Sequence, residues 1–262
     1  MAEKDGRRVR ESDRQVDNVA KGLTILNCFS SSESELSLKA LSEKTGLYKS
    51  RIMRLCGTLC AQGFLVKTSR ATYELGPRVM ILGKIYENTH NLLTTAGPVL
   101  DELASITGES SAIFMREGMN RFCVIQRIGP ASLRYSVREG EPLPLHAGAP
   151  GKVLLAWAPE DLRREFLEIG DFRRFTQWTI TDREELEREL EKVRERGYAQ
   201  SVGEVVPDAV SVAAPVFDHE NRVSYAIHLG GPTQRLTPEK REEVIPALVE
   251  AARRLSFLLG SE

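Results

Sequence analysis

The chain has 262 residues, 41% of them hydrophobic and 28% charged, a composition typical of a globular protein that is long enough for two hydrophobic cores. It contains no apolar run of about 18 residues, so we expect no membrane span and no membrane partner. The first residues, MAEKDGRRVRESDRQ, have mixed charge and lack the apolar stretch of a secretory signal. We expect them to form a mobile arm, and we expect the protein to be cytoplasmic.

The net charge of −1 hides an asymmetry along the chain. Residues 1–85 contain 15 Lys and Arg against 9 Asp and Glu, a net charge of +6, whereas the remainder contains 21 against 28, a net charge of −7. A basic first third joined to an acidic body is typical of a head that binds a polyanion and of a separate soluble domain. The charge by itself does not select nucleic acid, because ordinary domains reach similar values.

The first third contains three segments in which apolar residues recur at helical spacing. The first, VDNVAKGLTILNCF, carries one apolar stripe made of Val16, Val19, Leu23 and Leu26. The second, SLKALSEKTG, begins at a predicted N-cap, Ser37, and ends at Gly46. The third, KSRIMRLCGTLCAQG, follows that glycine turn and ends at Gly63. Two helices joined by a short turn that contains glycine predict a helix-turn-helix unit.

Two short runs of strand-like composition follow, FLVKT and TYELG, joined by SRA. We interpret them as the hairpin, or wing, of a winged helix-turn-helix. In such a unit the second helix enters the major groove of DNA, with its first residues nearest to the base edges. Cationic and hydroxyl side chains stand on the free face of that helix and on the wing, and we predict that they bind DNA: Lys49, Ser50, Arg51, Arg54, Lys67 and Arg70.

These six residues are expected to act in two ways. Arginine can donate a pair of hydrogen bonds to guanine, so Ser50, Arg51 and Arg54 are predicted to read bases. Lys49 and the two wing residues suit phosphates, which supply affinity without sequence information. The alternative is that each is a solvated surface residue. The glycine turn and the hairpin beside them favour DNA.

The apolar pattern changes after the wing. The segment GPRVMILGKIYENTH predicts a helix that starts at Pro77, and AGPVLDELASITGES predicts another that ends near Gly108. Strands are then predicted in the segments SSAIFMRE, RFCVIQRI, LRYSVRE, YAQSV, VSVAAPVF and RVSYAIHLGG. Strands bracketed by helices at both ends predict an α+β domain built on one sheet.

Two charged helices are predicted within and after these strands. The segment TDREELERELEKVRERG has a predicted capping box of Thr181 and Glu184, and Gly197 ends it. The last helix is expected to run from Pro238 to near Leu259. Both signs of charge alternate along the first of these helices, so we interpret its polar side as a solvated face.

The segment LHAGAPGKVLLA looks like a phosphate-binding loop, because Gly151 and Lys152 precede a helical run. The Walker pattern needs glycine at position 146 and Ser or Thr at position 153, where this chain has His146 and Val153, so we expect no nucleotide hydrolysis. What remains is a loop at a helix N-terminus, whose free backbone N–H groups could bind a carboxylate. The alternative is a loop that only buries its Ala and Pro side chains.

The order of these segments resembles that of the IclR family of transcriptional regulators. The resemblance covers about residues 16–257 and rests on LSLKALSEKTGLYKSRIMRLCGTLCAQGFL, YELGPRVMILG, GEPLPLHAGAPGKVLLA, RERGYAQSVGE and VSVAAPVFDHENRVSYAIHLGGP. It implies a winged helix-turn-helix head at 1–76, a linker helix at 77–95 and a GAF-like effector-binding domain at 96–262. It also implies homodimers, often paired as tetramers, on a palindromic operator in double-stranded DNA. We expect a repressor.

The resemblance further implies an effector pocket between the sheet and the loop before the Gly-Lys helix. The family's pocket positions correspond in this chain to Ser132, Tyr135, Leu143, Ala149, Pro150, Ser201, Ala209, Ser211, His228 and Gly230. Hydroxyls, an imidazole and free loop N–H groups suit a small carboxylate. His228 is expected either to donate a hydrogen bond to that ligand or to be an ordinary core histidine.

This chain departs from the family at two of these sites. The family usually has threonine after the recognition serine, where Arg51 stands here. It often has a small hydroxyl residue at the position of His228. The usual operator bases and the usual effectors therefore do not transfer to this chain.

Two other classes of function are alternatives. An enzyme has little support, because the four histidines, His90, His146, His219 and His228, occur without an HExxH or GxSxG motif or a nearby cysteine. A thiol switch would use Cys28, Cys56, Cys60 or Cys123. All four lie in apolar runs, whereas a sensing thiol should be exposed and have a lowered pKa. They form no CxxC pair, so we expect no metal and no cofactor.

Overall fold

The computed structural model describes residues 16–30, 32–89, 92–131 and 137–261. The predicted arm, Ser132, Tyr135 and most of the strand predicted in LRYSVRE lie outside the described residues. The chain divides into two compact units, Met1–Thr89 and His90–Glu262. The segment predicted as the linker, 77–95, takes in the last helix of the first unit and the start of the first helix of the second.

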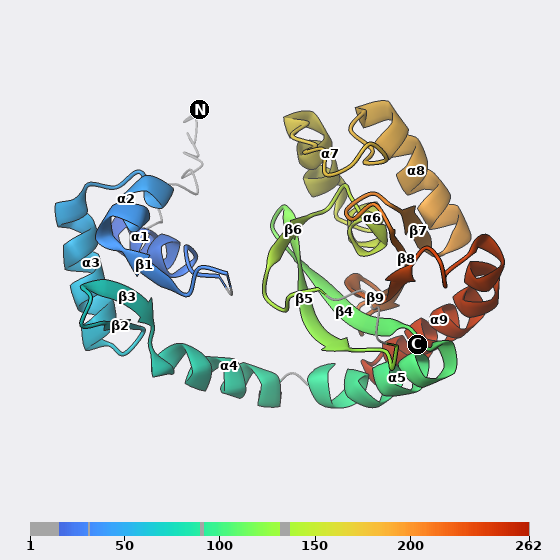
Figure 1. The fold of residues 1–262 in the computed structure, drawn as a ribbon, viewed down its shortest axis with the longest axis horizontal. Helices are drawn as coiled ribbons and strands as arrows, with labels where there is room; N and C mark the ends of the chain where they lie inside the picture. The colour runs from blue at the N-terminus through green and yellow to red at the C-terminus, as the bar shows by residue number, and fades with distance from the viewer. Residues whose placement is uncertain (1–15, 31, 90–91, 132–136, 262) are drawn as a thin grey trace, which may run out of the picture. The chain divides into compact units, whose positions relative to one another are not determined.

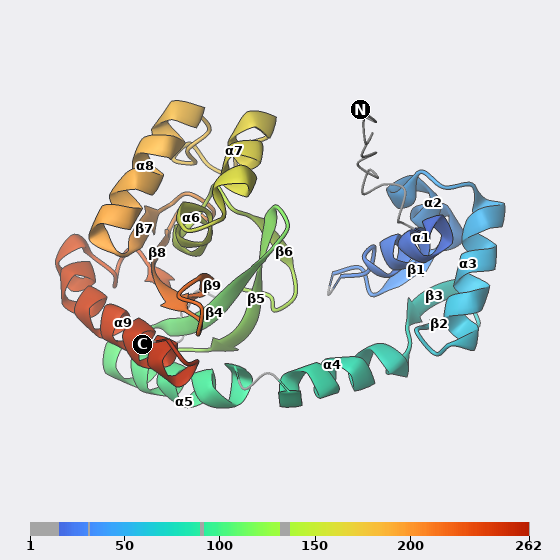
Figure 2. The ribbon, with the colours of Figure 1, turned by 180° about the vertical axis from the view of Figure 1, so that it is seen from behind.

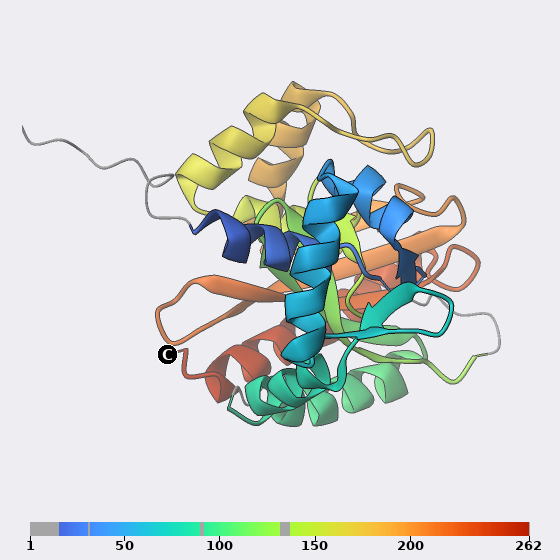
Figure 3. The same ribbon diagram turned by 90° about the vertical axis from the view of Figure 1, so that its left-hand side faces the viewer.

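The N-terminal unit is a winged helix-turn-helix (Figure 1). Its elements are α1 (Asp17–Leu26), β1 (Glu35–Ser37), α2 (Leu38–Thr45), α3 (Lys49–Ala61), β2 (Leu65–Lys67), β3 (Thr72–Leu75) and α4 (Pro77–Thr89). The strands pair antiparallel in the order β1-β3-β2. Figure 3 looks onto α3, with the β2–β3 hairpin beside it. The helices and the hairpin are those that the sequence predicts; β1 is an addition that pairs with β3.

Local signals set the ends of the helices in this unit. The Ser37 hydroxyl accepts a hydrogen bond from the Ala40 N–H at 3.1 Å and caps α2, as predicted. Gly46 then adopts φ 69°, the left-handed conformation that ends a helix and opens the turn to α3. Gly63 at φ 76° ends α3 in the same conformation before the hairpin. The core is apolar and contains Ile25, Leu36, Leu41, Ile52, Cys56, Leu65 and Tyr73.

Three of the four residues in the apolar stripe predicted for the first helix face outward, while Leu26 packs against the core. Val16, Val19 and Leu23 are 66, 60 and 55% exposed, whereas Gly22 and Ile25 of the same helix are buried. The helix has two apolar sides, and the one that holds Ile25 packs into the core. The outward stripe leaves an exposed apolar surface on the N-terminal unit.

The C-terminal unit contains one six-stranded sheet between two layers of helices (Figure 2). Its elements are α5 (Leu92–Thr107), β4 (Ser110–Glu117), β5 (Asn120–Arg127), β6 (Pro142–Pro144), α6 (Ala149–Ala156), α7 (Glu160–Ile169), α8 (Arg183–Arg196), β7 (Ala199–Val202), β8 (Ala209–Phe217), β9 (Val223–Pro232) and α9 (Pro238–Leu258). The strand order is β6-β5-β4-β9-β8-β7, and every pair is antiparallel. The α+β fold class is therefore correct.

Each face of the sheet has its own core. Helices α5 and α9 cover one face, and α6, α7 and α8 lie over the other (Figures 1 and 2). The central strands β8 and β9 are consequently buried over most of their length. Along β9, Ile227 packs with the α5–α9 layer, while Ala226 lies on the α6 side. His228 shares the face of Ala226, as the alternation predicts.

One local prediction for this unit is wrong. Asp182, and not Thr181, caps α8, because its carboxylate accepts a hydrogen bond from the Glu185 N–H at 2.8 Å. The Thr181 hydroxyl instead accepts from Arg174 at 2.6 Å. Of the strand predicted in LRYSVRE, residues 137–139 are described, and among them Glu139 forms an isolated bridge to Cys123; the rest of this prediction lies outside the described residues. Helix α7 and the short strand β6 were not predicted.

Candidate DNA-binding face and buried pocket

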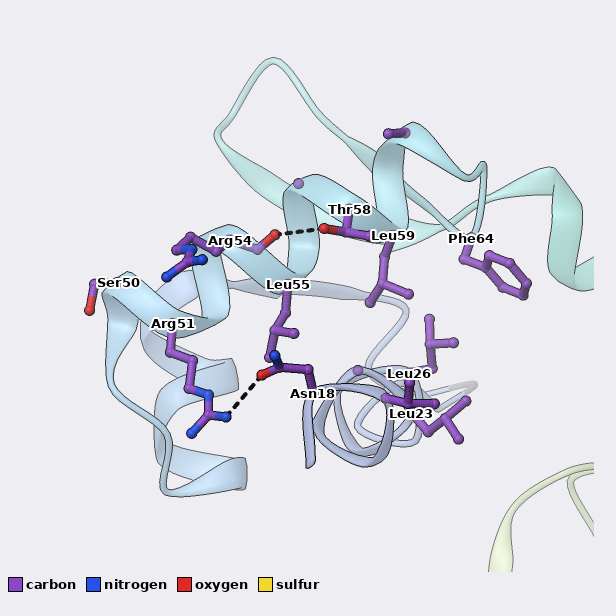
Figure 4. A pocket seen from close by; sticks show the side chains of 14 residues that line it. Asn18, Leu23, Leu26, Ser50, Arg51, Arg54, Leu55, Thr58, Leu59 and Phe64 are labelled. Atoms are coloured by element: carbon purple, nitrogen blue, oxygen red, sulfur yellow. Dashed lines mark hydrogen bonds between the residues drawn. The ribbon is translucent and has the colours of Figure 1, made fainter. Parts of the chain in front are cut away.

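Helix α3 separates apolar from polar side chains. Ile52 and Cys56 are fully buried, while Lys49, Ser50 and Arg54 are exposed at its start and middle. Ser50 and Arg54 also line one end of the groove between α1 and α3 (Figure 4). The wing residues Lys67 and Arg70 are also exposed. The structure therefore displays five of the six predicted DNA-binding residues on the surface of one unit.

Arg51 is only partly exposed and contacts α1. Its guanidinium donates hydrogen bonds to the Asp17 carboxylate and, at 3.0 Å, to Oδ1 of Asn18 (Figure 4). Asp17 also pairs with Lys21 at 2.6 Å, and the hydrogen bonds from Lys21 and Arg51 hold the pKa of the Asp17 carboxyl below its usual range. The Arg51 guanidinium, which is expected to meet DNA, is thus paired with a carboxylate of its own chain.

The wing has a similar contact at its exposed end. Arg70 Nη2 donates to a Glu35 carboxylate oxygen at 2.5 Å, and the Thr72 hydroxyl donates to the other oxygen of the same carboxylate. Glu35 lies on β1, so these bonds fix the hairpin to the rest of the sheet. One exposed residue near α3 was not singled out from the sequence: Tyr48, at the N-cap of α3, is 86% exposed.

A groove between α1 and α3 is lined mainly by apolar side chains. Leu23 and Leu26 of α1 face Leu55 and Leu59 of α3 across it, and Phe64 lies near one end (Figure 4). The exposed stripe of α1 borders this groove through Val19. The N-terminal unit therefore combines a cationic face with an apolar surface.

The C-terminal unit contains a narrow pocket between the sheet and the N-terminal end of α6, with a volume of about 10 Å³, roughly the space of one water molecule. It is lined by Phe114, Arg121, Gly148, Pro150, Ser201, Glu204, Val205, Val206, Ala209, Val210, Ser211 and His228. Five of the predicted effector residues are in this lining: Pro150, Ser201, Ala209, Ser211 and His228.

Three other predicted residues lie next to this lining. Leu143 pairs with Arg121 across β5 and β6, and Gly230 pairs with Ser211 across β8 and β9. Ala149 is fully buried and follows Gly148. The eight described residues of the predicted set thus lie in or next to the lining of one pocket, which also contains two charged residues that we did not predict, Arg121 and Glu204.

The backbone N–H groups of the loop before α6 are occupied, contrary to our expectation. The Gly148 N–H donates to the Glu204 carboxylate at 2.9 Å, and the Ala149 N–H donates to the Ser211 hydroxyl at 3.2 Å. The loop does bind a carboxylate, but the carboxylate is one of the chain's own. These two N–H groups are therefore not free for a ligand.

Glu204 also holds a buried cation. Lys152, 2% exposed, lies 2.6 Å from one Glu204 carboxylate oxygen and 3.5 Å from a carboxylate oxygen of Glu189 on α8. A lysine can be buried at this depth only when a carboxylate compensates its charge. The Gly-Lys pair that looks like a phosphate loop is thus part of an internal ion pair.

Arg121 is the second buried cation at the pocket. Its side chain extends from β5, and the residue is 2% exposed. The guanidinium carbon lies 5.7 Å from the centre of the Phe114 ring. Nη1 donates hydrogen bonds to the carbonyls of Pro144 and, at 2.6 Å, Ala147. A Cβ atom added at Gly151 would stand 2.6 Å from Nη1, and one added at Gly148 would stand 3.0 Å from Nη2. The two glycines of the GAPG segment therefore make room for a guanidinium.

The two buried histidines remain neutral at ordinary pH. Burial, together with the nearby positive charge of Arg121, lowers the pKa of His228 to about 3. Its ring meets that of Phe114 edge to face at 5.4 Å. Burial also lowers the pKa of His146, whose Nε2 lies 2.9 Å from the Arg173 carbonyl. A neutral imidazole can still donate one hydrogen bond, so the role expected for His228 is chemically available.

Cys28, Cys56 and Cys123 lack the lowered pKa that a redox-sensing thiol needs. Burial raises the pKa of the Cys56 thiol to about 11 and that of the Cys123 thiol to about 12. It also raises the pKa of the Cys28 thiol. Within the described residues, no group of His, Cys, Asp and Glu is placed to hold a metal ion, and no helix is long and apolar enough to cross a membrane.

An exposed cationic recognition helix beside a wing, joined to an α+β unit with a narrow polar pocket, defines the class of DNA-binding regulators that carry a separate ligand-binding domain. Comparison with known families supports this class at both ends of the chain. Residues 18–69 match the IclR helix-turn-helix domain, and residues 85–257 match the bacterial transcriptional regulator IclR C-terminal domain. The chain therefore belongs to the IclR family of transcriptional regulators and is not an enzyme.

Individual relatives agree over nearly the whole chain. The HTH-type transcriptional regulator XynR of Escherichia coli is 32% identical over 94% of this chain and 98% of its own length. The HTH-type transcriptional regulator BhcR of Paracoccus denitrificans is 32% identical over 90% of this chain and 85% of its own. Among solved structures, an IclR transcriptional regulator from Silicibacter shares 28% identity with a TM-score of 0.89, covering 94% of this chain and 97% of that one.

Proposed function

We propose that this regulator is a homodimeric repressor that reads a palindromic operator through Ser50, Arg51 and Arg54 and responds to a small organic acid in the C-terminal pocket. The observation that carries the DNA part is the exposed cationic face of α3, which starts directly after the Gly46 turn. In a helix-turn-helix the first residues of this helix meet the base edges. Lys49, Lys67 and Arg70 surround them and suit phosphates.

The exposed apolar surface supports the dimer. A single recognition helix covers too few base pairs for useful specificity, and two related by a two-fold axis would read half-sites one or more helical turns apart. Val16, Val19 and Leu23 of α1 and Met80 of α4 are more than half exposed, which is costly on an isolated unit and typical of a surface that meets a second copy. Light scattering of the protein on an operator-length duplex should give two or four chains, and a monomer would contradict the proposal.

The base-reading role can be tested by selecting binding sites from a random duplex library. We expect Arg51→Ala to lose about 1–3 kcal/mol of discrimination at one position in each half-site. Lys67→Ala should instead weaken binding to all sequences about equally and lower the salt dependence of binding, because a phosphate contact carries no sequence information. Identical sequence preferences for the wild type and Arg51→Ala would contradict the assignment.

The effector part rests on the pocket lining. Ser201, Ser211 and His228 bring two hydroxyls and a neutral imidazole to one narrow pocket. We propose that His228 donates a hydrogen bond to the ligand and that the bound ligand changes the spacing of the two DNA-binding heads. A ligand can regulate DNA binding in this way only if it binds one arrangement of the heads more tightly than the other. By calorimetry, His228→Ala should lose about 1–3 kcal/mol of ligand affinity and keep its operator affinity without ligand.

A further inference from the structure

The pocket of the C-terminal unit is lined by a buried cation, Arg121, that we did not predict from the sequence. The loop N–H groups expected to bind an anion are taken by Glu204 and Ser211. Lys152, the other cation nearby, is paired with Glu204. Arg121 is the cation in the pocket lining itself. An anionic ligand therefore needs to meet the guanidinium.

Arg121 also holds the loop that closes the pocket. Its acceptors, the carbonyls of Pro144 and Ala147, stand at the two ends of the turn between β6 and α6. The glycines at 148 and 151 let this turn pass directly over the guanidinium. As long as Arg121 donates to these carbonyls, the turn stays close to β5 and little space remains inside.

A carboxylate is a better acceptor than a carbonyl. An arginine stays charged at every pH at which a protein is folded, and a charged acceptor can take two parallel bonds from the guanidinium. In a buried site this charge-assisted pair is much stronger than a bond to a neutral carbonyl. A ligand that brings a carboxylate can therefore displace the carbonyls from Arg121, whereas a neutral isostere cannot.

We propose that Arg121 is the residue that restricts the effector to small carboxylates, and that the ligand's carboxylate replaces the Pro144 and Ala147 carbonyls and releases the 144–148 turn. This inference deepens the proposed function and rests on it. The released turn carries Gly148 and leads into α6, which Lys152 links to Glu189 on α8. Movement of the turn thus reaches a second helix of the C-terminal unit. His228 and the pocket serines would then contact the remainder of the acid.

The charge requirement can be tested without knowing the natural ligand. We would add acetate, pyruvate or benzoate, and separately acetamide, pyruvamide or benzamide, to the full-length protein at equal ionic strength and follow unfolding by tryptophan fluorescence. Both tryptophans, Trp157 and Trp178, lie in the C-terminal unit. At least one acid should raise the unfolding temperature, and its amide should not. An equal rise with acid and amide, or no rise with any acid, would overturn the inference.

Variants assign the effect to Arg121. Arg121→Gln should weaken the stabilising acid about 10- to 100-fold, and Arg121→Lys, which keeps the charge, should retain part of the preference for acid over amide. The matched control is Arg127→Gln on the same strand. Arg127 pairs with Asp101 on the α5 side at 2.8 Å, away from the pocket, so this variant should bind the acid as the wild type does. If Arg121→Gln does not fold, Arg121→Lys and the acid–amide comparison in the wild type still decide.

Regulation is tested with the duplex that the wild type selects from the library. The acid should change operator affinity in the wild type and in Arg127→Gln but not in Arg121→Gln. Loss of the acid effect with retained operator binding supports the role of Arg121, and an unchanged acid effect overturns it. Failure of the wild type to bind any duplex would instead contradict the proposed function, so the two failures are distinguishable.

Discussion

The arginines of the two units lie in opposite environments. In the N-terminal unit the side chains of Arg51 and Arg70 are 38% and 75% exposed and contact carboxylates at the surface. In the C-terminal unit Arg121 is 2% exposed and donates to backbone carbonyls. Exposed ion pairs contribute about 0–1 kcal/mol, so a phosphate or a base can replace the carboxylate at little cost. A buried charge must stay matched, so exchanging its partner changes the structure around it.

This difference suits the two tasks. A head that searches DNA exchanges partners at every site it visits, and weak surface contacts keep Arg51 available. A sensing domain needs two states that are separated by a clear change of contacts. Arg121 holds the loop before α6, and Lys152 is paired with Glu204. Removing one partner of either contact leaves a buried charge without the group that compensates it. If this difference holds, removing a buried charge should change stability more than removing an exposed charge changes stability or DNA binding.

The largest expected effect comes from the buried pair. Glu204→Gln removes the charge that compensates Lys152 and should cost about 3 kcal/mol of the free energy of unfolding. Urea unfolding followed by tryptophan fluorescence measures this, since both tryptophans report on the C-terminal unit. The control is Glu102→Gln, which breaks a pair with Arg254 whose side chains are 51 and 54% exposed, and it should cost less than about 1 kcal/mol. Equal losses of unfolding free energy in the two variants would show that burial does not decide the cost of removing a charge.

A pH effect of intermediate size is expected from His228. Its folded-state pKa of about 3 lies below the ordinary value of 6.5, so the unfolded chain binds more protons below pH 6.5. The C-terminal unit should therefore become less stable as the pH is lowered. His228 should contribute a loss of about 2 kcal/mol of the free energy of unfolding between pH 7 and pH 5.

The matched measurement is urea unfolding of His228→Gln at the same two pH values. The variant should lose about 2 kcal/mol less than the wild type on acidification. His146 remains in the variant, and its lowered pKa leaves a residual slope of the same sign. The same slope in both proteins would mean that the His228 imidazole takes up its proton without cost in the folded state.

The sequence was a good guide where the signal is local. Ser37 and Gly46 predicted the ends of α2, and alternation predicted the face of His228. Strand β1 escaped prediction because three residues become a strand only through pairing with β3. The stripe of α1 was seen, but periodicity does not tell which of two apolar sides of a helix meets the core.

The pocket shows a further limit. Glu204 lies in a loop and contacts Gly148 and Lys152, more than fifty positions earlier, so no local pattern points to it. Arg121 had a usable signal, because it is two residues before Cys123 in a strand and therefore shares its buried face. Free N–H groups were inferred from the loop alone, and the partners that occupy them come from two distant elements.

The smallest predicted effect returns to the exposed arginine of the head. Asp17→Asn removes the carboxylate that Arg51 contacts and leaves the Asn18 contact at 3.0 Å in place. Arg51 can then meet DNA without giving up an ion pair, so binding to all duplexes should tighten a few-fold. Discrimination should fall slightly, because a guanidinium freed from Asp17 can also donate to the phosphates of duplexes that were not selected.

The control separates this contact from the charge alone. Glu43→Gln removes an equal charge from the same unit, but Glu43 pairs with Lys39 on α2 and does not contact Arg51. Fluorescence anisotropy with the selected duplex and with a scrambled one would compare the two variants at low and at physiological salt. The part of the effect shared by both variants is long-range repulsion of phosphates, and added salt screens it. Only Asp17→Asn should also reduce the ratio between selected and scrambled duplex, because only this change frees a base-reading side chain. If both variants behave alike, Asp17 acts as a surface charge, and Arg51 needs no partner on α1 to read its base.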